Sequence, residues 1–135
     1  MKKQGVNTMP MSRVQNESRE DYLEAIYLLS GKEGGAVRSV RIAEFMGFSK
    51  ASVSRAVSVL KEDGYVETDS RSMVFLTREG MDEAKRVYRK HCYFEDQLLK
   101  AGVDAETANA EACRMEHAIS DNSFEKLMKL SSVYY

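Results

Sequence analysis

Residues of the types that bind metal ions gather in three short stretches of the 135-residue chain. Within each stretch they fall three or four positions apart, or side by side: Asp21 and Glu24, then His91 and Glu95, then Cys113, Glu116 and His117. Residues at such spacings share one face of a helix. Carboxylate, imidazole and thiolate groups are common ligands of divalent transition metals, so the stretches are candidate metal-binding clusters.

Each stretch also has an ordinary structural explanation. Asp21 could be the acidic residue of a capping box that Ser18 opens at the start of a helix. His91 could be a core histidine and Cys113 a small apolar filler. Spacing does not prove that the helices meet, so both explanations stay open at this point.

Hydrophobic periodicity predicts a mainly α-helical (α+β) chain. The expected helices cover residues 18–31, 39–46, 50–64, 78–100 and 105–119, with a short sixth at 123–130. Two expected strands, YVET and MVFLT, flank a turn at residues 69–72. The apolar stripes expected to face inward include Tyr22, Ile26 and Leu29, then Val40, Ala43 and Met46, then Val53, Ala56, Val57 and Leu60. The polar residues 1–17 lack this periodicity and are expected to form a flexible arm.

The second and third expected helices are joined by the three-residue turn Gly47-Phe48-Ser49. Two helices joined by a short glycine-containing turn are typical of a helix-turn-helix. The hairpin that follows would be its wing, although any small α+β domain can contain two helices and a hairpin. We therefore expect a winged helix-turn-helix followed by a helical domain.

The exposed face of the third helix and the wing tip carry groups suited to DNA. The candidate contact residues are Ser49, Lys50, Ala51, Ser52, Arg55 and Arg71. Small residues near the start of a helix allow a close approach to the major groove, and Arg55 could read a guanine edge or hold a phosphate. The alternative is that these are ordinary solvated residues. Two cations per chain are few for binding DNA, so a dimer on a palindromic site is expected.

Composition limits the class of protein. Hydrophobic residues make up 43% and charged residues 30%, which is typical of a soluble globular chain. No apolar run is long enough to span a membrane, and two cysteines are too few for a disulfide framework. A cytoplasmic location is expected. The net charge of −1 is low for a nucleic-acid binder, but residues 49–60 hold two basic side chains and no acid.

Residues 18–122 resemble the DtxR/MntR family of metal-dependent transcriptional repressors. The matching stretches are SREDYLEAIYLL, VRIAEFMGFSKASVSRAVSVLKEDGYVE, VFLTREG, KHCYFEDQLLKAGV and EACRMEHAISD. The resemblance implies a winged-helix DNA-binding domain, expected at residues 18–77, and a helical metal-binding and dimerisation domain, expected at 78–135. It also implies a short form of the family, without the SH3-like domain of longer members.

The resemblance implies ligand roles for all seven metal-type residues. By position they match first-helix ligands (Asp21, Glu24), long-helix ligands (His91, Glu95) and dimerisation-helix ligands (Cys113, Glu116, His117). Asp21 matches the manganese-responsive branch, whereas Cys113 and Glu95 match the iron-responsive branch. An accessory histidine of the iron branch is Asn109 here. Mn(II) and Fe(II) are both candidates for the signal, and Zn(II) or Co(II) could bind in vitro because thiolates favour softer ions.

The implied function is repression of manganese or iron uptake genes by a homodimer on a double-stranded DNA operator. The metal would bridge the first helix to the dimerisation helices. The alternative is a metal-independent winged-helix regulator that senses a small organic ligand or a protein partner. A metalloenzyme is not expected, because the chain has no H-E-x-x-H motif and no glycine-rich substrate loop.

Overall fold

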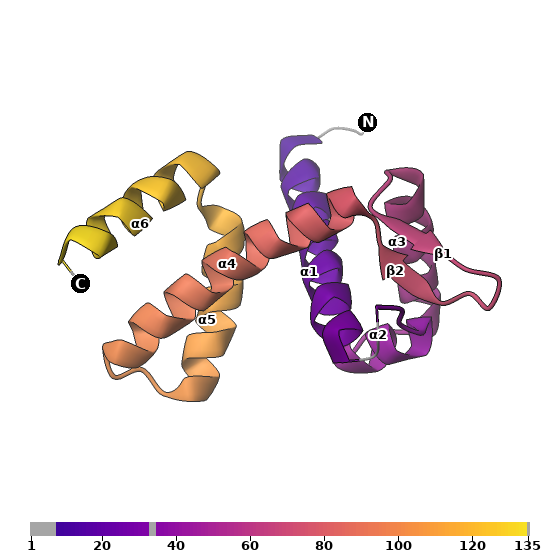
Figure 1. Ribbon diagram of the computed structural model, residues 1–135, viewed down its shortest axis with the longest axis horizontal. Coiled ribbons are helices and arrows are strands. Elements are labelled where there is room, and N and C mark those ends of the chain that lie inside the picture. Colours follow the sequence, from indigo (N-terminus) through magenta and orange to yellow (C-terminus); the bar gives the residue numbers. More distant parts are fainter. Residues whose placement is uncertain (1–7, 33–34, 135) are drawn as a thin grey trace. The chain divides into compact units, whose positions relative to one another are not determined.

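The computed structural model describes residues 8–32 and 35–134, which form six helices and one two-stranded antiparallel sheet (Figure 1). The elements are α1 (Thr8–Lys32), α2 (Ser39–Met46), α3 (Lys50–Glu62), β1 (Val66–Thr68), β2 (Val74–Leu76), α4 (Arg78–Lys100), α5 (Ala105–Ala118) and α6 (Asp121–Tyr134). The chain divides into two compact units, Met1–Lys85 and Arg86–Tyr135, and the boundary falls within α4. The predicted mainly helical fold, a winged helix-turn-helix followed by a helical domain, is confirmed.

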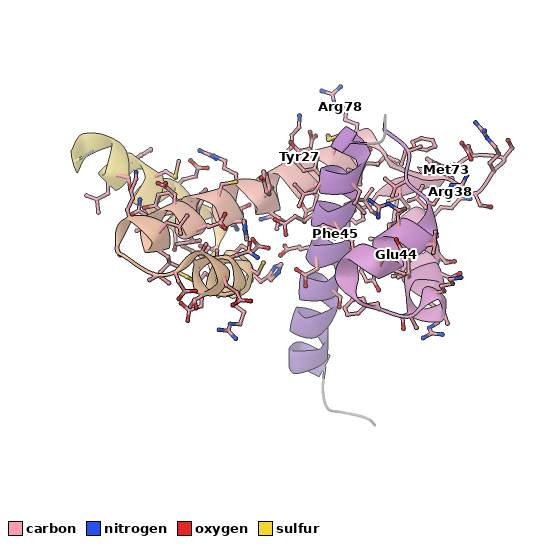
Figure 2. The ribbon with its side chains drawn as sticks, turned by 90° about the horizontal axis from the view of Figure 1, so that it is seen from below. Tyr27, Arg38, Glu44, Phe45, Met73 and Arg78 are labelled. Carbon is pink, nitrogen blue, oxygen red and sulfur yellow. The ribbon has the colours of Figure 1, made fainter. Side chains whose placement is uncertain are left out.

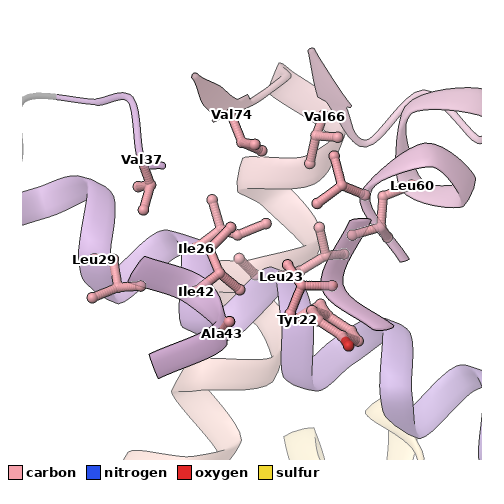
Figure 3. Packing of buried hydrophobic residues seen from close by; sticks show 13 residues of the cluster. Tyr22, Leu23, Ile26, Leu29, Val37, Ile42, Ala43, Leu60, Val66 and Val74 are labelled. Atoms are coloured by element: carbon pink, nitrogen blue, oxygen red, sulfur yellow. The ribbon is translucent and has the colours of Figure 1, made fainter. Parts of the chain in front are cut away.

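The first unit is built around an apolar core to which α1, α2, α3 and both strands contribute (Figure 3). Its most deeply buried side chains, each at most 1% exposed, are Leu23, Ile26, Val37, Ile42, Val53, Val66, Val74 and Ala84, the last from the start of α4. Full burial of a valine, leucine or isoleucine side chain contributes about 1.5–3 kcal/mol relative to exposure. This core fixes α3 against α1 and so determines which face of α3 remains open to solvent.

Local signals define the helix-turn-helix and the wing. Gly47 ends α2 with a φ of 73°, a left-handed conformation that suits glycine, and Ser49 caps the start of α3. The hairpin pairs Val66 with Leu76 and Thr68 with Val74. Its turn extends away from the helices of this unit (Figure 1). The wing is therefore anchored at its base by buried valines and open at its tip.

Two expectations about the first unit are wrong. Helix α1 begins at Thr8, not at Ser18, so residues 8–17 of the expected arm are helical, and residues 1–7 lie outside the described part of the chain. Pro10 is compatible with this start because the first turn of a helix needs no backbone donor there. In α2, Ile42 is fully buried while Val40 is 36% exposed. A helix of eight residues offers two overlapping apolar stripes, and the packing selects the one that contains Ile42.

The second unit has a smaller apolar cluster of Phe94, Ala112 and Phe124. Tyr93 meets the Phe124 ring edge-on, with 5.5 Å between ring centroids. Helix α6 is longer than the expected segment 123–130, because Ser120 caps it by accepting a hydrogen bond from the Ser123 amide at 3.1 Å. Within the described residues, every helix is too short or too polar to cross a bilayer.

Candidate metal centre and nucleic-acid interface

Three potential metal ligands of the second unit converge between α4 and α5. His91 comes from α4, and Cys113 and Glu116 come from α5. The His91 Nδ1 atom lies 3.0 Å from a Glu116 carboxylate oxygen and 3.6 Å from the Cys113 sulfur. One ligand atom from each of the three residues lies within 4.8 Å of the others. The structure therefore joins two of the three stretches that sequence spacing could only describe separately.

Burial makes this group unusual. Glu116 is 1% exposed, and its second carboxylate oxygen, Oε1, has no hydrogen bond within the described residues. A buried carboxylate oxygen without a hydrogen bond is costly, since it has lost water, and its neighbour His117 Nε2 is 3.5 Å away. A divalent cation would supply the missing partner. The nitrogen, sulfur and oxygen donors fit a transition metal better than magnesium or calcium, which prefer oxygen alone.

The group also sets the protonation of its histidine. Hydrogen bonds from His91 to Cys113 and then to Glu116 raise the pKa of His91 to about 11, and burial opposes them only in part. Without metal, the imidazole is protonated at neutral pH and balances the negative groups around it. A metal that took this nitrogen as a ligand would have to displace the proton, so binding would release protons.

Glu95 and His117 lie beside the three-donor group. Glu95 is 3.5 Å from Nε2 of His91, on the side of the ring away from Nδ1. His117 is 3.5 Å from Oε1 of Glu116, with its side chain 6% exposed. A carboxylate on the far nitrogen of a ligand histidine commonly fixes the orientation of the ring. Glu95 thus has the geometry of an orienting residue.

The remaining two metal-type residues belong to the first unit. Asp21 and Glu24 both lie on α1, where Asp21 is partly exposed and Glu24 is 8% exposed. A buried carboxylate on a helix that otherwise contributes to an apolar core needs a polar or ionic environment. These two side chains remain candidates on their own helix.

Two of the residues predicted to contact DNA build the start of α3. Ser49 accepts a hydrogen bond from the Ser52 amide at 3.1 Å and donates one to the Ser52 hydroxyl at 3.0 Å. This cap satisfies one of the free amides at the helix start. The other amides of the first turn remain available to an anion such as a phosphate.

The exposed face of α3 carries Lys50, Ala51 and Arg55, all solvent-exposed. Ser54 is exposed on the same face and was missed in the sequence analysis, although its spacing of four from Lys50 could have revealed it. Behind this face, Tyr22 of α1 packs on Phe48 of the turn with 5.9 Å between ring centroids. Burial raises the pKa of Tyr22, and the nearby charge of Arg55 partly offsets that rise.

The tip of the wing is preorganised around Asp69. One of its carboxylate oxygens accepts hydrogen bonds from the amides of Arg71 and Met73, at 2.9 and 3.0 Å. These bonds lower the pKa of Asp69. Ser72 takes a left-handed φ of 61° to complete the turn. The exposed Arg71 side chain is therefore presented from a defined turn.

The surface around α2 has mixed charge. Figure 2 shows the side chains of Arg38 and Glu44 on this part of the first unit. Arg38 is exposed directly before α2, and Arg41 pairs with Glu44 at 3.4 Å. Positive groups that could meet a phosphate backbone thus extend beyond α3.

A winged helix-turn-helix in the same chain as a helical unit with a buried group of metal-type donors defines a class, that of ligand-responsive DNA-binding regulators. The model of the family described as "Iron dependent repressor, N-terminal DNA binding domain" matches residues 16–74. The model described as "Iron dependent repressor, metal binding and dimerisation domain" matches residues 77–132. The chain belongs to this family of metal-dependent transcriptional repressors, and the predicted resemblance is confirmed.

Individual relatives agree with the family. The chain is 34% identical over 113 residues to a helix-turn-helix transcriptional regulator of Methanocaldococcus jannaschii, covering 83% of this chain and 90% of the relative. It is 34% identical over 116 residues to the transcriptional regulator MntR of Lysinibacillus sphaericus, covering 86% and 83%. It is 36% identical over 115 residues to the iron-dependent repressor IdeR of Mycobacterium tuberculosis, covering 84% of this chain and 50% of IdeR. All three relatives are named as transcriptional regulators or repressors.

Solved structures show the same fold. The manganese regulator SloR superimposes with a TM-score of 0.74 at 34% identity, covering 84% of this chain and 53% of SloR. The chain thus spans most of the length of the first two relatives and about half the length of IdeR and SloR.

Proposed function

We propose that this protein is a metal-activated repressor of manganese or iron uptake genes, with Mn(II) or Fe(II) as the signal. The observation that carries the proposal is the group of buried His91, partly exposed Cys113 and buried Glu116, with one Glu116 oxygen left without a hydrogen bond. The manganese regulator SloR and the iron-dependent repressor IdeR are about equally similar to the chain, at 34% and 36% identity, so both ions are retained.

The proposed ligands extend beyond this group. They are Cys113, Glu116 and His117 on α5, His91 on α4, and Asp21 and Glu24 on α1, with Glu95 as an accessory ligand. The bound cation would supply positive charge that offsets the repulsion among these carboxylates. Asp21 and Glu24 would then tie α1, which belongs to the DNA-binding unit, to the helices of the second unit. A coupling of about 1–3 kcal/mol would raise DNA affinity about 5- to 150-fold.

The proposed DNA contacts follow the exposed face of α3 and the wing. The residues are Ser49, Lys50, Ala51, Ser52, Arg55 and Arg71. Arg55 would contact a base edge or a phosphate, and Arg71 the backbone or minor groove beside the wing. A homodimer would place two copies of α3 on a palindromic operator, with half-sites about 34 Å apart. Two copies would also compensate for the few cations in each chain.

The test is DNA binding by fluorescence anisotropy under anaerobic, reducing conditions at fixed salt. The probe is DNA from upstream of the protein's own gene neighbourhood, titrated separately with Mn(II), Fe(II), Co(II) and Zn(II). We expect at least one of Mn(II) and Fe(II) to raise the affinity about tenfold or more, within the range that such a coupling allows. An affinity that no metal changes would favour the metal-independent regulator.

Three variants separate the parts of the proposal. Asp21→Ala and Glu116→Ala should abolish the metal-dependent gain while leaving a folded dimer. Arg55→Ala should weaken DNA binding with metal affinity retained. Full metal stimulation in either acidic variant would contradict the bridging role, and unchanged operator affinity in Arg55→Ala would remove that residue from the interface.

A further inference from the structure

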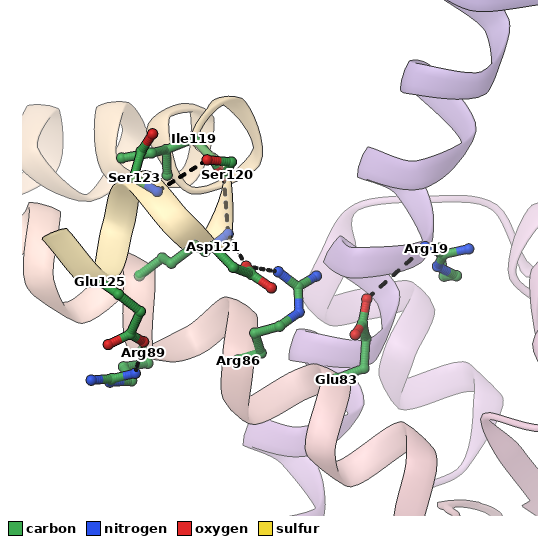
Figure 4. Close-up of polar contacts among 10 residues, drawn as sticks. Arg19, Glu83, Arg86, Arg89, Ile119, Ser120, Asp121, Ser123 and Glu125 are labelled. Atoms are coloured by element: carbon green, nitrogen blue, oxygen red, sulfur yellow. Dashed lines mark hydrogen bonds and ion pairs between the residues drawn. The ribbon is translucent and has the colours of Figure 1, made fainter.

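Lys90 is the one lysine that the described part of the chain buries, at 3% exposure. Its ammonium group donates a hydrogen bond to the backbone carbonyl of Ile119 at 3.0 Å and pairs with Asp121 at 2.8 Å. Arg86 binds the same Asp121 carboxylate at 2.6 Å (Figure 4). A buried ammonium group loses its hydration, so its presence here requires these partners.

The partners of Lys90 lie on the link between α5 and α6. Ile119 is the C-cap of α5, with an extended backbone, so its carbonyl cannot continue the helix. Asp121 begins α6. This link starts only two residues after His117 and three after Glu116. Lys90 therefore binds the end of the helix that carries the candidate ligands. A cation at a helix C-terminus is also favourable to the helix dipole.

Lys90 directly precedes His91 on α4. Successive residues of a helix point about 100° apart, so the two side chains reach different parts of the same segment. His91 meets Cys113 and Glu116, and Lys90 meets the link that follows them. One helical turn of α4 therefore holds the end of α5 at two places.

We propose that Lys90 is a positioning residue of the metal centre, which holds the end of α5 against α4 so that the donor atoms are in place before the metal binds. Stability alone explains Lys90 poorly, because burial costs its ammonium group its hydration while its partner Asp121 is 61% exposed and gives only a partly screened ion pair in return. A positioning role explains its burial better, because the contacts of Lys90 with the Ile119 carbonyl and with Asp121 constrain where the α5–α6 link can lie. Preorganised ligands bind more tightly because less ordering remains to be done on binding.

The test compares Lys90→Met with a matched control, Arg89→Met, using Co(II) alone as the probe. Both substitutions remove one positive charge from α4. Arg89, however, pairs with Glu125 further along α6, at 2.7 Å, and does not touch the link (Figure 4). Lys90→Met should fold, because Asp121 is 61% exposed and keeps Arg86 as a partner.

We expect Lys90→Met to weaken Co(II) binding about 10- to 100-fold, as loss of an outer positioning contact does at other metal sites. The thiolate-to-cobalt absorption band from Cys113 should weaken, and in the metal-free protein the amides of residues 116–121 should exchange faster with solvent. Arg89→Met should change the affinity about twofold at most, as for other exposed pairs. A purely electrostatic role gives the opposite sign, because removal of a nearby cation would tighten binding.

Equal or tighter Co(II) binding by Lys90→Met, with unchanged amide exchange, would overturn the inference. If that variant does not fold, Asp121→Ala removes one of the two acceptors at an exposed position and should cause a smaller loss in the same direction; no loss overturns the inference. The inference rests on the proposed metal centre. A wild-type chain that binds Co(II) with a thiolate–cobalt band but gains no DNA affinity with Mn(II) or Fe(II) would contradict the proposed function alone, whereas a wild-type chain without that band would overturn the inference.

Discussion

The two units of the chain are stabilised in different ways. The first unit encloses thirteen buried residues in one apolar cluster, and its buried polar side chains, among those described, are Glu24 and Ser30. The second unit has an apolar cluster of only three buried residues, and it buries Lys90, His91 and Glu116 beside it. The first unit is thus held mainly by apolar packing, whereas the second unit buries charged groups beside a smaller apolar cluster. A cation that binds these groups would raise the free energy of unfolding of the second unit, because a ligand that binds only the folded state stabilises it.

The largest expected effect is in the apolar core of the first unit. Ile26→Ala removes a fully buried side chain and should lower the free energy of unfolding by about 2–5 kcal/mol. Phe45→Ala, at a position 53% exposed, is the matched surface change and should cost about 0.5 kcal/mol or less. Denaturant unfolding measures both. Similar losses in the two variants would mean that the apolar core does not dominate this unit.

The next effect concerns the second unit and its response to metal. Co(II) at about one hundred times its Kd should stabilise the wild-type chain by about 2.7 kcal/mol. Glu116→Gln keeps the shape of the side chain but removes its charge, so this gain should largely disappear. Glu125→Gln, exposed on α6, should retain it. Thermal unfolding with and without Co(II) decides the point, and a full metal-induced shift in Glu116→Gln would place the ion elsewhere.

A smaller effect is expected where the wing meets α4. A Cβ at Gly80 would overlap the backbone carbonyl of Tyr65, which accepts a hydrogen bond from the Thr77 amide at 3.0 Å. Gly80→Ala should therefore cost about 1–3 kcal/mol, because backbone must move. Gly31→Ala on α1 has open space and should instead stabilise by about 0.5–1 kcal/mol. Equilibrium unfolding should show opposite signs, and a neutral Gly80→Ala would show that this contact is easily relaxed.

The elements were predictable where local signals are strong. The bounds of α4 at Arg78 and Lys100 and the cap of α5 at Asp104 agree with the sequence analysis. The start of α1 was missed because residues 8–17 carry no regular apolar stripe and include Pro10 and Asn16, which are weak helix formers. The inward face of α2 was mistaken at Val40, where two stripes compete within a short helix.

The candidate site was predictable by residue type but not by arrangement. Sequence spacing groups Cys113 with Glu116 but cannot show that His91, 22 residues before Cys113, meets them. That meeting depends on the packing of α4 on α5. Lys90 gave no signal at all, since a lysine on a predicted amphipathic helix is normally solvated. Only the position of the α5–α6 link shows why it is buried.

The smallest effect is a pH dependence at that link. The hydrogen bond from Lys90, and after it the one from Arg86, lowers the pKa of Asp121 below its ordinary value of 3.8. A lowered pKa stabilises the folded state above the ordinary value, and this contribution is lost as the pH falls through the lowered pKa. The stability difference between the wild type and Asp121→Asn should therefore be constant from about pH 7 to 5 and shrink below about pH 4. The same comparison in a Lys90→Met background should show a weaker pH dependence, because the main cause of the shift is gone. Urea unfolding across this range measures it. A difference that stays constant down to pH 2 would show that the ionised Asp121 contributes nothing to the folded state, and that Lys90 acts at this link through the Ile119 carbonyl rather than through Asp121.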